Sequence, residues 1–325
     1  MDRGHKDADK DLKKLERKLK KEYQQAYEEM SEKTNAWLKQ FRVTDLEKYS
    51  LLEDGAISYD EYIQWRKNAM LSTAQMNGIC EDLARTLTGY NQTATGMINA
   101  NARSAFIQNY NYGAYEICKN AGVNFGFDLV DEKTVNRLIK ENPKLLPKAK
   151  VAVKKDMKWN EKKVRSALTQ GILQGDSIDK IANRLKAVAK MSDSAAVRNA
   201  RTMTTSAENG GRMAVYEEAQ DMGIELEKTW VATLDDRTRD AHIELDGVTI
   251  PIDQPFENSI GKIMYPADPE ADDENVYNCR CTLISSMKGY KRDLSTRQTA
   301  SSLGNWTYDT WKRDAMERAE EKKKR

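Results

Sequence analysis

The chain has 325 residues, of which 32% are charged and 39% are hydrophobic, and its formal net charge is only +2. This length suits about two domains, and the charge content favours long, solvent-exposed helices over one large globular core. The small net charge excludes the global positive field of a typical nucleic-acid binder, four cysteines are too few for a disulfide scaffold, and no apolar run is long enough to span a membrane.

The first residues lead into charge rather than into an apolar segment, so we expect no signal peptide. We therefore expect the protein to be made, and to assemble, in a reducing cytoplasm.

Residues 10–42 are predicted to form an N-terminal helix with an apolar stripe at spacings of three and four. The stripe consists of Leu12, Leu15, Leu19, Tyr23, Ala26 and Met30. It covers about three heptads, so it suits either a coiled-coil partner or docking on the rest of the chain. Residues 1–57 are assigned to a charged helical arm.

Residues 58–147 are predicted to form a helical domain. One helix is expected from Trp65 to Leu87, with a break near Thr88-Gly89, and a second from Met97 to Cys118. The methionine and aromatic residues of both helices, and the thiols of Cys80 and Cys118, are expected in a helix–helix core. Pro143 and Pro147 place the main domain boundary, because proline is rarely tolerated inside a helix.

Residues 148–285 are predicted to form a second domain, helical over 160–222. Its first helix is expected to close at Gly175, and a second to begin at Asp176 and bury Ile181, Leu185 and Val188. A third helix is expected over residues 194–221, with Gly223 as its C-cap. Ala196 and Ala200 would permit close packing there.

Residues 224–285 are predicted to form a small β-containing module. Strands are expected over 228–233, 248–250 and 282–284, with a turn at Asp246-Gly247 and a short helix, capped by Asp235 or Asp236, through Glu244. A polar helical tail follows over 286–325. The expected fold is therefore mostly α, with long helical N-terminal and central regions and a small α+β C-terminal module.

His242, Cys279 and Cys281 are candidate metal ligands in this module, because zinc takes imidazole and thiolates tetrahedrally. A carboxylate from Asp235, Asp236 or Asp240 would complete the site, although Cys-x-Cys is less typical of structural zinc than Cys-x-x-Cys. A plainer alternative places both cysteines on one face of a strand and Arg280 on the other.

A third interpretation is an enzyme in which a cysteine is the nucleophile and His242 the base. No nucleophile elbow or glycine-rich phosphate loop accompanies these residues. On physical grounds we favour a polar network over a metal site or an active site. In this network Arg237, Arg239 and Arg280 pair with the acidic residues of 268–274, and these pairs stabilise a module whose core is small.

The same segment carries an ordered set of motifs that resembles the phage Mu F-like head morphogenesis family. The signature residues are Trp230, Asp235, Arg237, Thr238, Arg239, His242, Asp246, Gly247, Tyr265, Pro266, Asn278, Cys279, Arg280 and Cys281. The helical lead-in is also similar, through the Asn209-Gly210-x-Arg212 region, so the resemblance covers about residues 165–285. Ala267 stands where the family often has glycine.

The resemblance implies a structural, non-enzymatic minor capsid protein of a tailed bacteriophage. It implies docking on the portal protein, or on the major capsid or scaffold protein, at the portal vertex or inside the capsid, with assembly in the host cytoplasm and no membrane. It implies no catalytic residue and no cofactor, so zinc is a candidate from the ligand types alone. The alternative is a metal-dependent or Cys–His enzyme carried in the phage head.

Residues 144–165 contain nine Lys and Arg residues against Asp156 and Glu161. Such a run is usually a solvated face, but it would also suit nonspecific contact with packaged DNA. The candidate contact residues are Lys148, Lys150, Lys154, Lys155, Lys158, Lys162, Lys163 and Arg165. No stacking platform or recognition helix accompanies them, so base readout is not expected.

Overall fold

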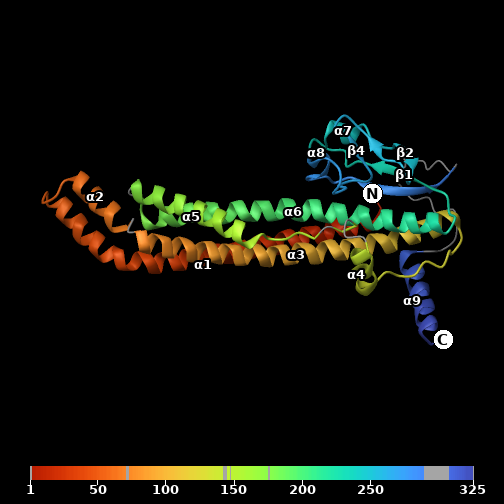
Figure 1. Cartoon of the computed structure of the whole chain (residues 1–325), viewed down its shortest axis with the longest axis horizontal. Helices are drawn as coiled ribbons and strands as arrows, with labels where there is room; N and C mark the ends of the chain where they lie inside the picture. Colours follow the sequence, from red (N-terminus) through yellow and green to blue (C-terminus); the bar gives the residue numbers. More distant parts are fainter. Residues whose placement is uncertain are drawn as a thin grey trace. The chain divides into compact units, whose positions relative to one another are not determined.

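The computed structural model describes residues 2–70, 73–141, 145–146, 148–174, 176–288 and 307–324. Within these ranges the protein is mostly helical, with a small sheet in its C-terminal part (Figure 1). The predicted fold class is confirmed. Pro143, Pro147 and Gly175, on which predicted boundaries rest, lie outside the described residues.

Helix α1 (Arg3–Glu53) is longer at both ends than predicted, and a turn containing Gly55, with φ of 70°, connects it to α2 (Tyr59–Met70). Ser58 and Glu61 form a capping box at the start of α2. The Glu61 N–H donates to Ser58 Oγ at 3.2 Å, and the Ser58 N–H donates to Glu61 Oε2 at 2.8 Å. Two otherwise unpaired backbone donors are thereby satisfied.

Helix α3 (Thr73–Ala121) is continuous, so the predicted break near Thr88-Gly89 is wrong. The predicted helix from Trp65 to Leu87 falls on α2 and α3, and residues 71–72 between them lie outside the described residues. Leu87 and Thr88 are buried. We attribute the continuity to this burial, which outweighs the roughly 1 kcal/mol that a glycine costs inside a helix.

Helix α4 (Glu132–Glu141) is capped by Asp131, whose carboxylate accepts a hydrogen bond from the Thr134 N–H at 2.8 Å. Helix α5 (Val153–Leu173) follows. Helix α6 (Ile178–Asp221) is one continuous helix where the sequence analysis predicted two. No glycine or proline occurs between residues 189 and 209, and the buried stripe continues through Val188, Ala189, Ser192, Ala196 and Ala200.

The C-cap predicted at Gly223 is confirmed. Its φ is 82°, and the Ile224 N–H donates to the Ala219 carbonyl at 2.9 Å. The chain then enters the sheet.

The module after α6 is built on a three-stranded antiparallel sheet in the order β2–β1–β5. Its strands are β1 (Leu226–Val231), β2 (Thr249–Pro251) and β5 (Thr282–Met287), which confirms the three predicted strand positions. Trp230 lies opposite Leu283 in the register. The remaining elements are α7 (Asp240–Ile243), β3 (Phe256–Glu257), β4 (Lys262–Ile263), which pairs with β3, α8 (Asp273–Val276) and, in the tail, α9 (Tyr308–Lys324).

The chain forms two compact units. Unit 1 comprises Met1–Leu15, Ile98–Lys148 and Arg198–Arg325, and unit 2 comprises Glu16–Met97 and Ala149–Val197. The units do not follow chain order, because α1, α3 and α6 each contribute one end to each unit.

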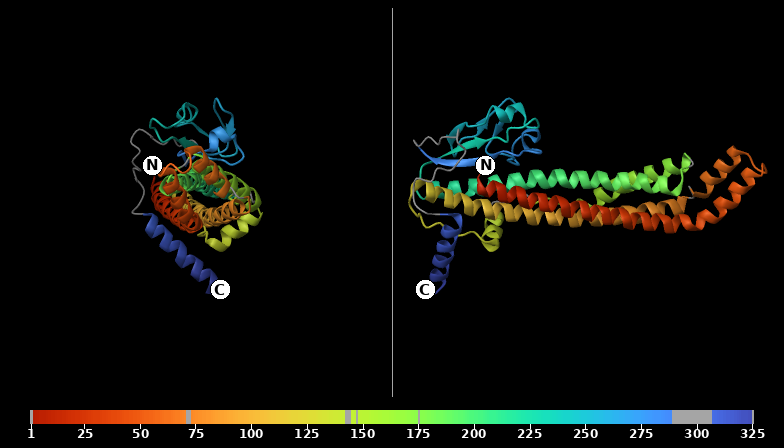
Figure 2. Two further views of the ribbon diagram at one scale, coloured as in Figure 1. Left: turned by 90° about the vertical axis from the view of Figure 1, so that its left-hand side faces the viewer. Right: turned by 180° about the vertical axis from the view of Figure 1, so that it is seen from behind.

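In unit 2, stretches of α1, α3, α5 and α6 run side by side (Figure 2). Leu19, Tyr23, Ala26 and Met30 of the predicted apolar stripe are all buried. The Tyr23 hydroxyl donates to Asn91 Oδ1 at 2.8 Å, and the Asn91 amide donates to Asp156 Oδ2 at 3.0 Å. The stripe therefore packs on the chain itself and is not available to a coiled-coil partner.

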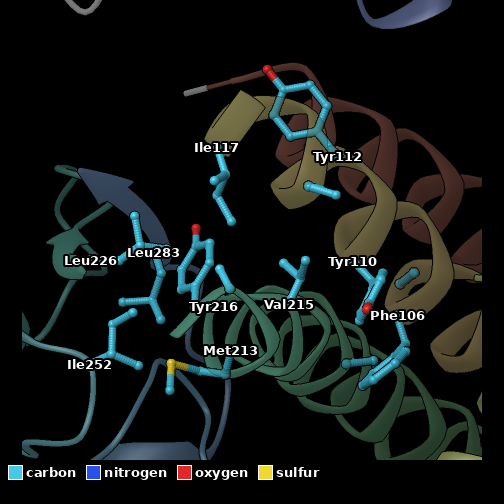
Figure 3. Packing of buried hydrophobic residues seen from close by; sticks show 14 of the residues in the cluster. Phe106, Tyr110, Tyr112, Ile117, Met213, Val215, Tyr216, Leu226, Ile252 and Leu283 are labelled. Carbon is cyan, nitrogen blue, oxygen red and sulfur yellow. The ribbon is translucent and has the colours of Figure 1, made fainter. Parts of the chain in front are cut away.

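In unit 1, α3 and α6 approach closely because glycines lie at the crossing. A Cβ on Gly211 would lie 2.4 Å from the Phe106 carbonyl oxygen, and one on Gly113 would lie 2.7 Å from Val215 Cγ1. Figure 3 shows Phe106 and Tyr110 beside Val215, with residues of the sheet module next to Met213 and Tyr216. The sheet module thus shares the core of the helices.

A buried ionic network lies beside this core. The guanidinium of Arg212, 0% exposed, donates to the Asp2 carboxylate through two hydrogen bonds of 2.8 Å and to the Leu283 carbonyl at 2.7 Å. The His5 ring accompanies it, with Nδ1 2.8 Å from Glu208 Oε1. The network ties α1, α6 and β5 together within unit 1.

Candidate functional site

His242, Cys279 and Cys281 converge in the interior of the sheet module. His242 lies in α7, and the cysteines lie in the extended segment before β5. The two sulfurs lie 3.7 Å (Cys279) and 3.6 Å (Cys281) from His242 Nδ1. All three residues are buried. The fold therefore brings together the three predicted ligand residues, although 37 and 39 positions separate the cysteines from His242 in the sequence.

Two asparagines orient the imidazole. His242 Nε2 lies 3.3 Å from Asn275 Oδ1, which also accepts a hydrogen bond of 3.0 Å from the Asn258 amide. An acceptor at Nε2 places the imidazole proton there and leaves the lone pair on Nδ1. That lone pair is directed at the two sulfurs.

The two thiols are electrostatically different. Burial, together with the neighbouring Cys281, raises the pKa of Cys279 well above its usual range. The hydrogen bond that the Cys279 thiol donates lowers the pKa of Cys281 despite burial, and the neighbouring His242 lowers it further. A single negative charge on the pair is thus favoured at Cys281.

Aromatic side chains enclose the cluster. The Trp230 ring lies edge-on to the His242 ring at 5.3 Å and to the Phe256 ring at 5.2 Å. A shallow hollow of about 370 Å³ lies nearby, lined by Arg239, Ile260, Asp273, Glu274 and Tyr277, and so not by the cluster itself.

None of the carboxylates predicted as a fourth ligand joins the cluster. Among the described residues, the group of metal-ligating atoms within 4.8 Å of one another consists of His242, Cys279 and Cys281. Asp235, Asp236 and Asp240 are exposed. The prediction of a carboxylate ligand from these three residues is therefore wrong, because their side chains face solvent.

The predicted pairing of the arginines with the acidic residues of 268–274 is also wrong. Arg280 Nη1 donates to Asp235 Oδ2 at 2.6 Å, and Arg237 lies 3.4 Å from the same oxygen. Arg239 donates to the Tyr277 carbonyl. The polar network exists, but the arginines pair with Asp235 and with a backbone carbonyl.

The alternation predicted for the cysteine segment is found, because Cys279 and Cys281 are buried and Arg280 is partly exposed. The two cysteines nevertheless precede β5 and do not lie within it.

Several signature residues shape the backbone around the cluster. Asp246 Oδ1 accepts a hydrogen bond from the Ala232 N–H at 2.8 Å, and Gly247 has φ of 81°. Thr238 donates to the Thr233 carbonyl. Asn278 has φ of 57°, a region that asparagine tolerates better than most residues. These residues hold the backbone in its turns. Local structure therefore explains their residue types, and no catalytic or metal-binding role is needed to do so.

The turn around Tyr265-Pro266 is held by Asp268. Its carboxylate accepts hydrogen bonds from the N–H groups of Met264 at 3.2 Å and Glu270 at 2.9 Å. Ala267 adopts φ of 60°, which explains why glycine suits this position.

Side chains of helix α6 donate hydrogen bonds to the backbone of the cysteine segment. Thr205 donates to the Cys279 carbonyl at 2.8 Å, and Asn209 donates to the Cys281 carbonyl at 3.2 Å. Thr205, Asn275 and Asn258 were missed as site residues, because no spacing links them to the cysteines. Asn209 lies in the helical segment that also resembles the family, and this resemblance could have identified it as a site residue.

The candidate DNA-contact residues lie in unit 2, except Lys148, which is the last residue of the unit 1 segment Ile98–Lys148. Lys154, Lys158 and Lys162 recur every four residues on α5 and are exposed. Lys163 packs over the Trp159 ring at 5.3 Å, and Arg165 pairs with Glu161 at 2.9 Å. The other candidates, Lys148, Lys150 and Lys155, are exposed. One face of α5 therefore presents repeated positive charge to solvent.

Within the part of the chain that the structure describes, no helix combines the length and apolar character needed to cross a membrane.

Comparison with known proteins gives two relatives and one family. Residues 162–284 match the family described as Phage Mu protein F like protein. The chain is 28% identical over 246 residues to Minor head protein GP7 of Bacillus phage SPP1, covering 75% of each protein. It is 31% identical over 162 residues to NAD(+)--arginine ADP-ribosyltransferase EFV of Enterococcus faecalis, covering 50% of this chain but only 33% of that enzyme. No solved structure matches the chain.

Proposed function

Residues 162–284 form a domain of the Phage Mu protein F-like family, and on that premise we propose that the chain is a structural minor head protein of a tailed bacteriophage. Its role in this proposal is head morphogenesis, by docking on the portal protein or on the inner capsid or scaffold surface. It would accordingly be found in the virion, at the portal vertex or inside the capsid, after assembly in the host cytoplasm.

The observation that carries the proposal is the similarity to the minor head protein. That similarity extends over 246 residues, well beyond residues 162–284, and covers three quarters of both chains. The helices outside the module are thus part of what the two proteins have in common. The similarity to the ADP-ribosyltransferase leaves two thirds of that enzyme unmatched, so it does not support transferase activity here.

The interior of the sheet module also supports a non-enzymatic role. The cluster of His242, Cys279 and Cys281 is at most 2% exposed, and the Trp230 ring lies edge-on to His242. A nucleophile must approach a substrate to within about 3–3.5 Å, and this enclosure offers no such approach. The signature residues around it hold turns and ion pairs.

Unit 2 offers an apolar surface suited to docking. Val43, Leu46 and Tyr49, near the end of α1, are 63%, 64% and 46% exposed, and Tyr59 at the start of α2 is 63% exposed. These four apolar side chains are exposed within a short stretch at the end of α1 and the start of α2, and exposed apolar surface favours protein–protein contact. We assign the contact with portal or capsid protein to this surface and call it the α1–α2 surface.

The exposed lysines of α5 would contact packaged DNA in the same proposal. Charge that recurs every four residues lies on one face of a helix, and phosphate contacts of this kind give affinity without sequence specificity. The contact would supplement docking and would not replace it.

The proposal is tested by mixing the purified full chain with purified portal protein, and separately with proheads that lack the chain. Co-sedimentation with either one supports docking. The matched variants are Leu46→Glu, on the α1–α2 surface, and Glu28→Lys, on an exposed part of α1 away from it. We expect the first to lose binding and the second to keep it. Absence of binding by the folded wild-type chain to both partners would overturn the proposal.

A further inference from the structure

We infer that His242, Cys279 and Cys281 bind one zinc ion that holds the sheet module together. His242 would bind through Nδ1, the cysteines would bind as thiolates, and a water molecule would take the fourth position. This site is independent of the proposed role in head assembly, because a head protein needs no metal.

The two nitrogen–sulfur distances match a tetrahedral zinc site, and all three ligand atoms lie within 4.8 Å of one another. With Zn–S of about 2.3 Å and Zn–N of about 2.0–2.1 Å, the nitrogen–sulfur edge of a tetrahedron is about 3.6 Å. The distances from Nδ1 to the sulfurs of Cys279 and Cys281 are 3.7 Å and 3.6 Å. An ion can therefore enter with little movement of the ligands.

The orientation of the imidazole favours a metal over hydrogen bonds alone. Its Nδ1 carries one lone pair, because Nε2 faces the acceptor Oδ1 of Asn275. One lone pair can accept a single good hydrogen bond, yet two sulfurs lie at nearly equal distance from it. A cation bound between the three atoms would be coordinated by both sulfurs and by the nitrogen lone pair.

The surroundings have the features of a second shell around a metal. Metal-binding histidines usually donate their other ring N–H to an oxygen, which Asn275 supplies, and Asn258 in turn fixes Asn275. Thr205 and Asn209 hold the backbone carbonyls of the two cysteines. The ligands are thus placed before any ion arrives.

The charge of such a site suits its burial. Two thiolates balance the charge of Zn²⁺, so no carboxylate is required, and none joins the cluster in the described part of the chain. The remaining cysteines and histidine of the sequence are elsewhere: Cys80 and Cys118 lie in α3, and His5 lies in α1. This leaves the fourth position to water, and the ion would be a structural link between α7 and the segment before β5.

The test measures the metal content of the full chain, purified without a metal-affinity step and without chelator. We expect roughly one zinc ion per chain by elemental analysis, because the three protein ligands and one water complete a single four-coordinate site. Cys281→Ser and His242→Ala should lose the metal, whereas Cys118→Ser, which alters an equally buried thiol outside the cluster, should keep it. Chelation should lower the melting temperature of the wild type and of Cys118→Ser.

A second readout on the wild type alone guards against variants that fail to fold. Titration of the metal-free chain with Co²⁺ should produce a thiolate-to-cobalt charge-transfer band and visible bands of tetrahedral intensity, and Zn²⁺ should displace both. Metal-free protein that gives no thiolate band with Co²⁺ would overturn the inference. So would recovery of the wild type with a Cys279–Cys281 disulfide and no metal.

Discussion

The carboxylate of Asp2 and the guanidinium of Arg212 form a two-point ion pair inside unit 1, with both hydrogen bonds at 2.8 Å. The residues are 210 positions apart in the sequence, and the Arg212 side chain is 0% exposed. Arg212 also lies in the helical lead-in of the family resemblance. The pair therefore connects the residue that precedes α1 to the domain that carries the signature residues.

Removing Arg212 should destabilise the protein strongly. Arg212→Met leaves the buried Asp2 carboxylate without its cation, which costs on the order of 3–5 kcal/mol. The free energy of unfolding from urea titration measures the effect. The control is Arg85→Met, which breaks an exposed pair with Glu81, 68% and 58% exposed, and should cost less than about 1 kcal/mol. Equal effects of the two variants would contradict the structural role given to Arg212.

The Asp2–Arg212 pair should also make stability depend on acid pH. Burial alone would raise the pKa of the Asp2 carboxyl, but the charge and hydrogen bonds of Arg212 outweigh it and lower the pKa to about 2, from 3.8. A lowered carboxyl pKa gives stability that is present above the unfolded value and is lost as the pH falls from 3.8 towards 2. Asp2→Asn should therefore be less stable than the wild type at pH 7, by about 2 kcal/mol, and the difference should shrink below pH 4. Urea unfolding at several pH values checks this, and a difference that stays constant with pH would count against it.

Lys228 should make stability depend on alkaline pH as well, and here too stability should rise with pH. Its side chain is 0% exposed, and its ammonium donates to the Met264 carbonyl at 2.9 Å. Burial lowers the pKa of Lys228 from 10.5 to about 8. The unfolded chain then binds more protons between these values, so the stability contributed by this residue rises with pH.

The comparison variant for this trend is Lys228→Met. Relative to this variant, the wild type should gain up to about 3 kcal/mol between pH 7.5 and pH 10.5. Denaturant unfolding of both proteins across that range measures the change. A wild type that loses stability relative to Lys228→Met as pH rises would show that the ammonium is stabilised by its surroundings.

The fold was predictable where the local pattern decides the structure. The buried stripe of α1, the C-cap at Gly223 and the strand around Trp230 all follow from spacing and residue type. The predicted interruptions of α3 near Thr88 and of α6 before residue 194 were wrong, because burial of Leu87, Thr88 and the stripe through Ser192 outweighs weak local signals. Tertiary packing decided those boundaries.

The candidate site was predictable in its residue types but not in its geometry. His242, Cys279 and Cys281 were singled out as the concentrated soft ligands of the chain. Their partners could not be found, because Asn258 and Asn275 meet through loops that the sequence does not place. Arg280 was likewise assigned to the wrong acidic residues, since the turn at 233–238 brings Asp235 to it.

The lysines of α5 should determine any affinity for DNA. Changing Lys154, Lys158 and Lys162 to Glu should weaken binding to mixed-sequence duplex and should reduce the slope of log affinity against log salt by about 2–3, since each phosphate contact contributes about 0.9. Changing Lys18, Lys21 and Lys39, exposed on α1, makes the same alteration of charge elsewhere and should leave the slope unchanged. Fluorescence anisotropy at several salt concentrations measures both. A slope that responds equally to the two sets would assign binding to overall charge instead of to α5.

The central claim is that this chain is a structural component of the phage head, and its content in assembled particles tests that claim most directly. Proheads and mature heads are purified from infections with the intact gene, with the Leu46→Glu variant and with the gene deleted, and the chain is quantified by mass spectrometry along with the infectivity per particle. We expect the wild-type chain in the particles, a much lower content for the variant, and fewer infectious particles without the gene. Proheads that contain no wild-type chain, together with unchanged infectivity after deletion, would contradict the account.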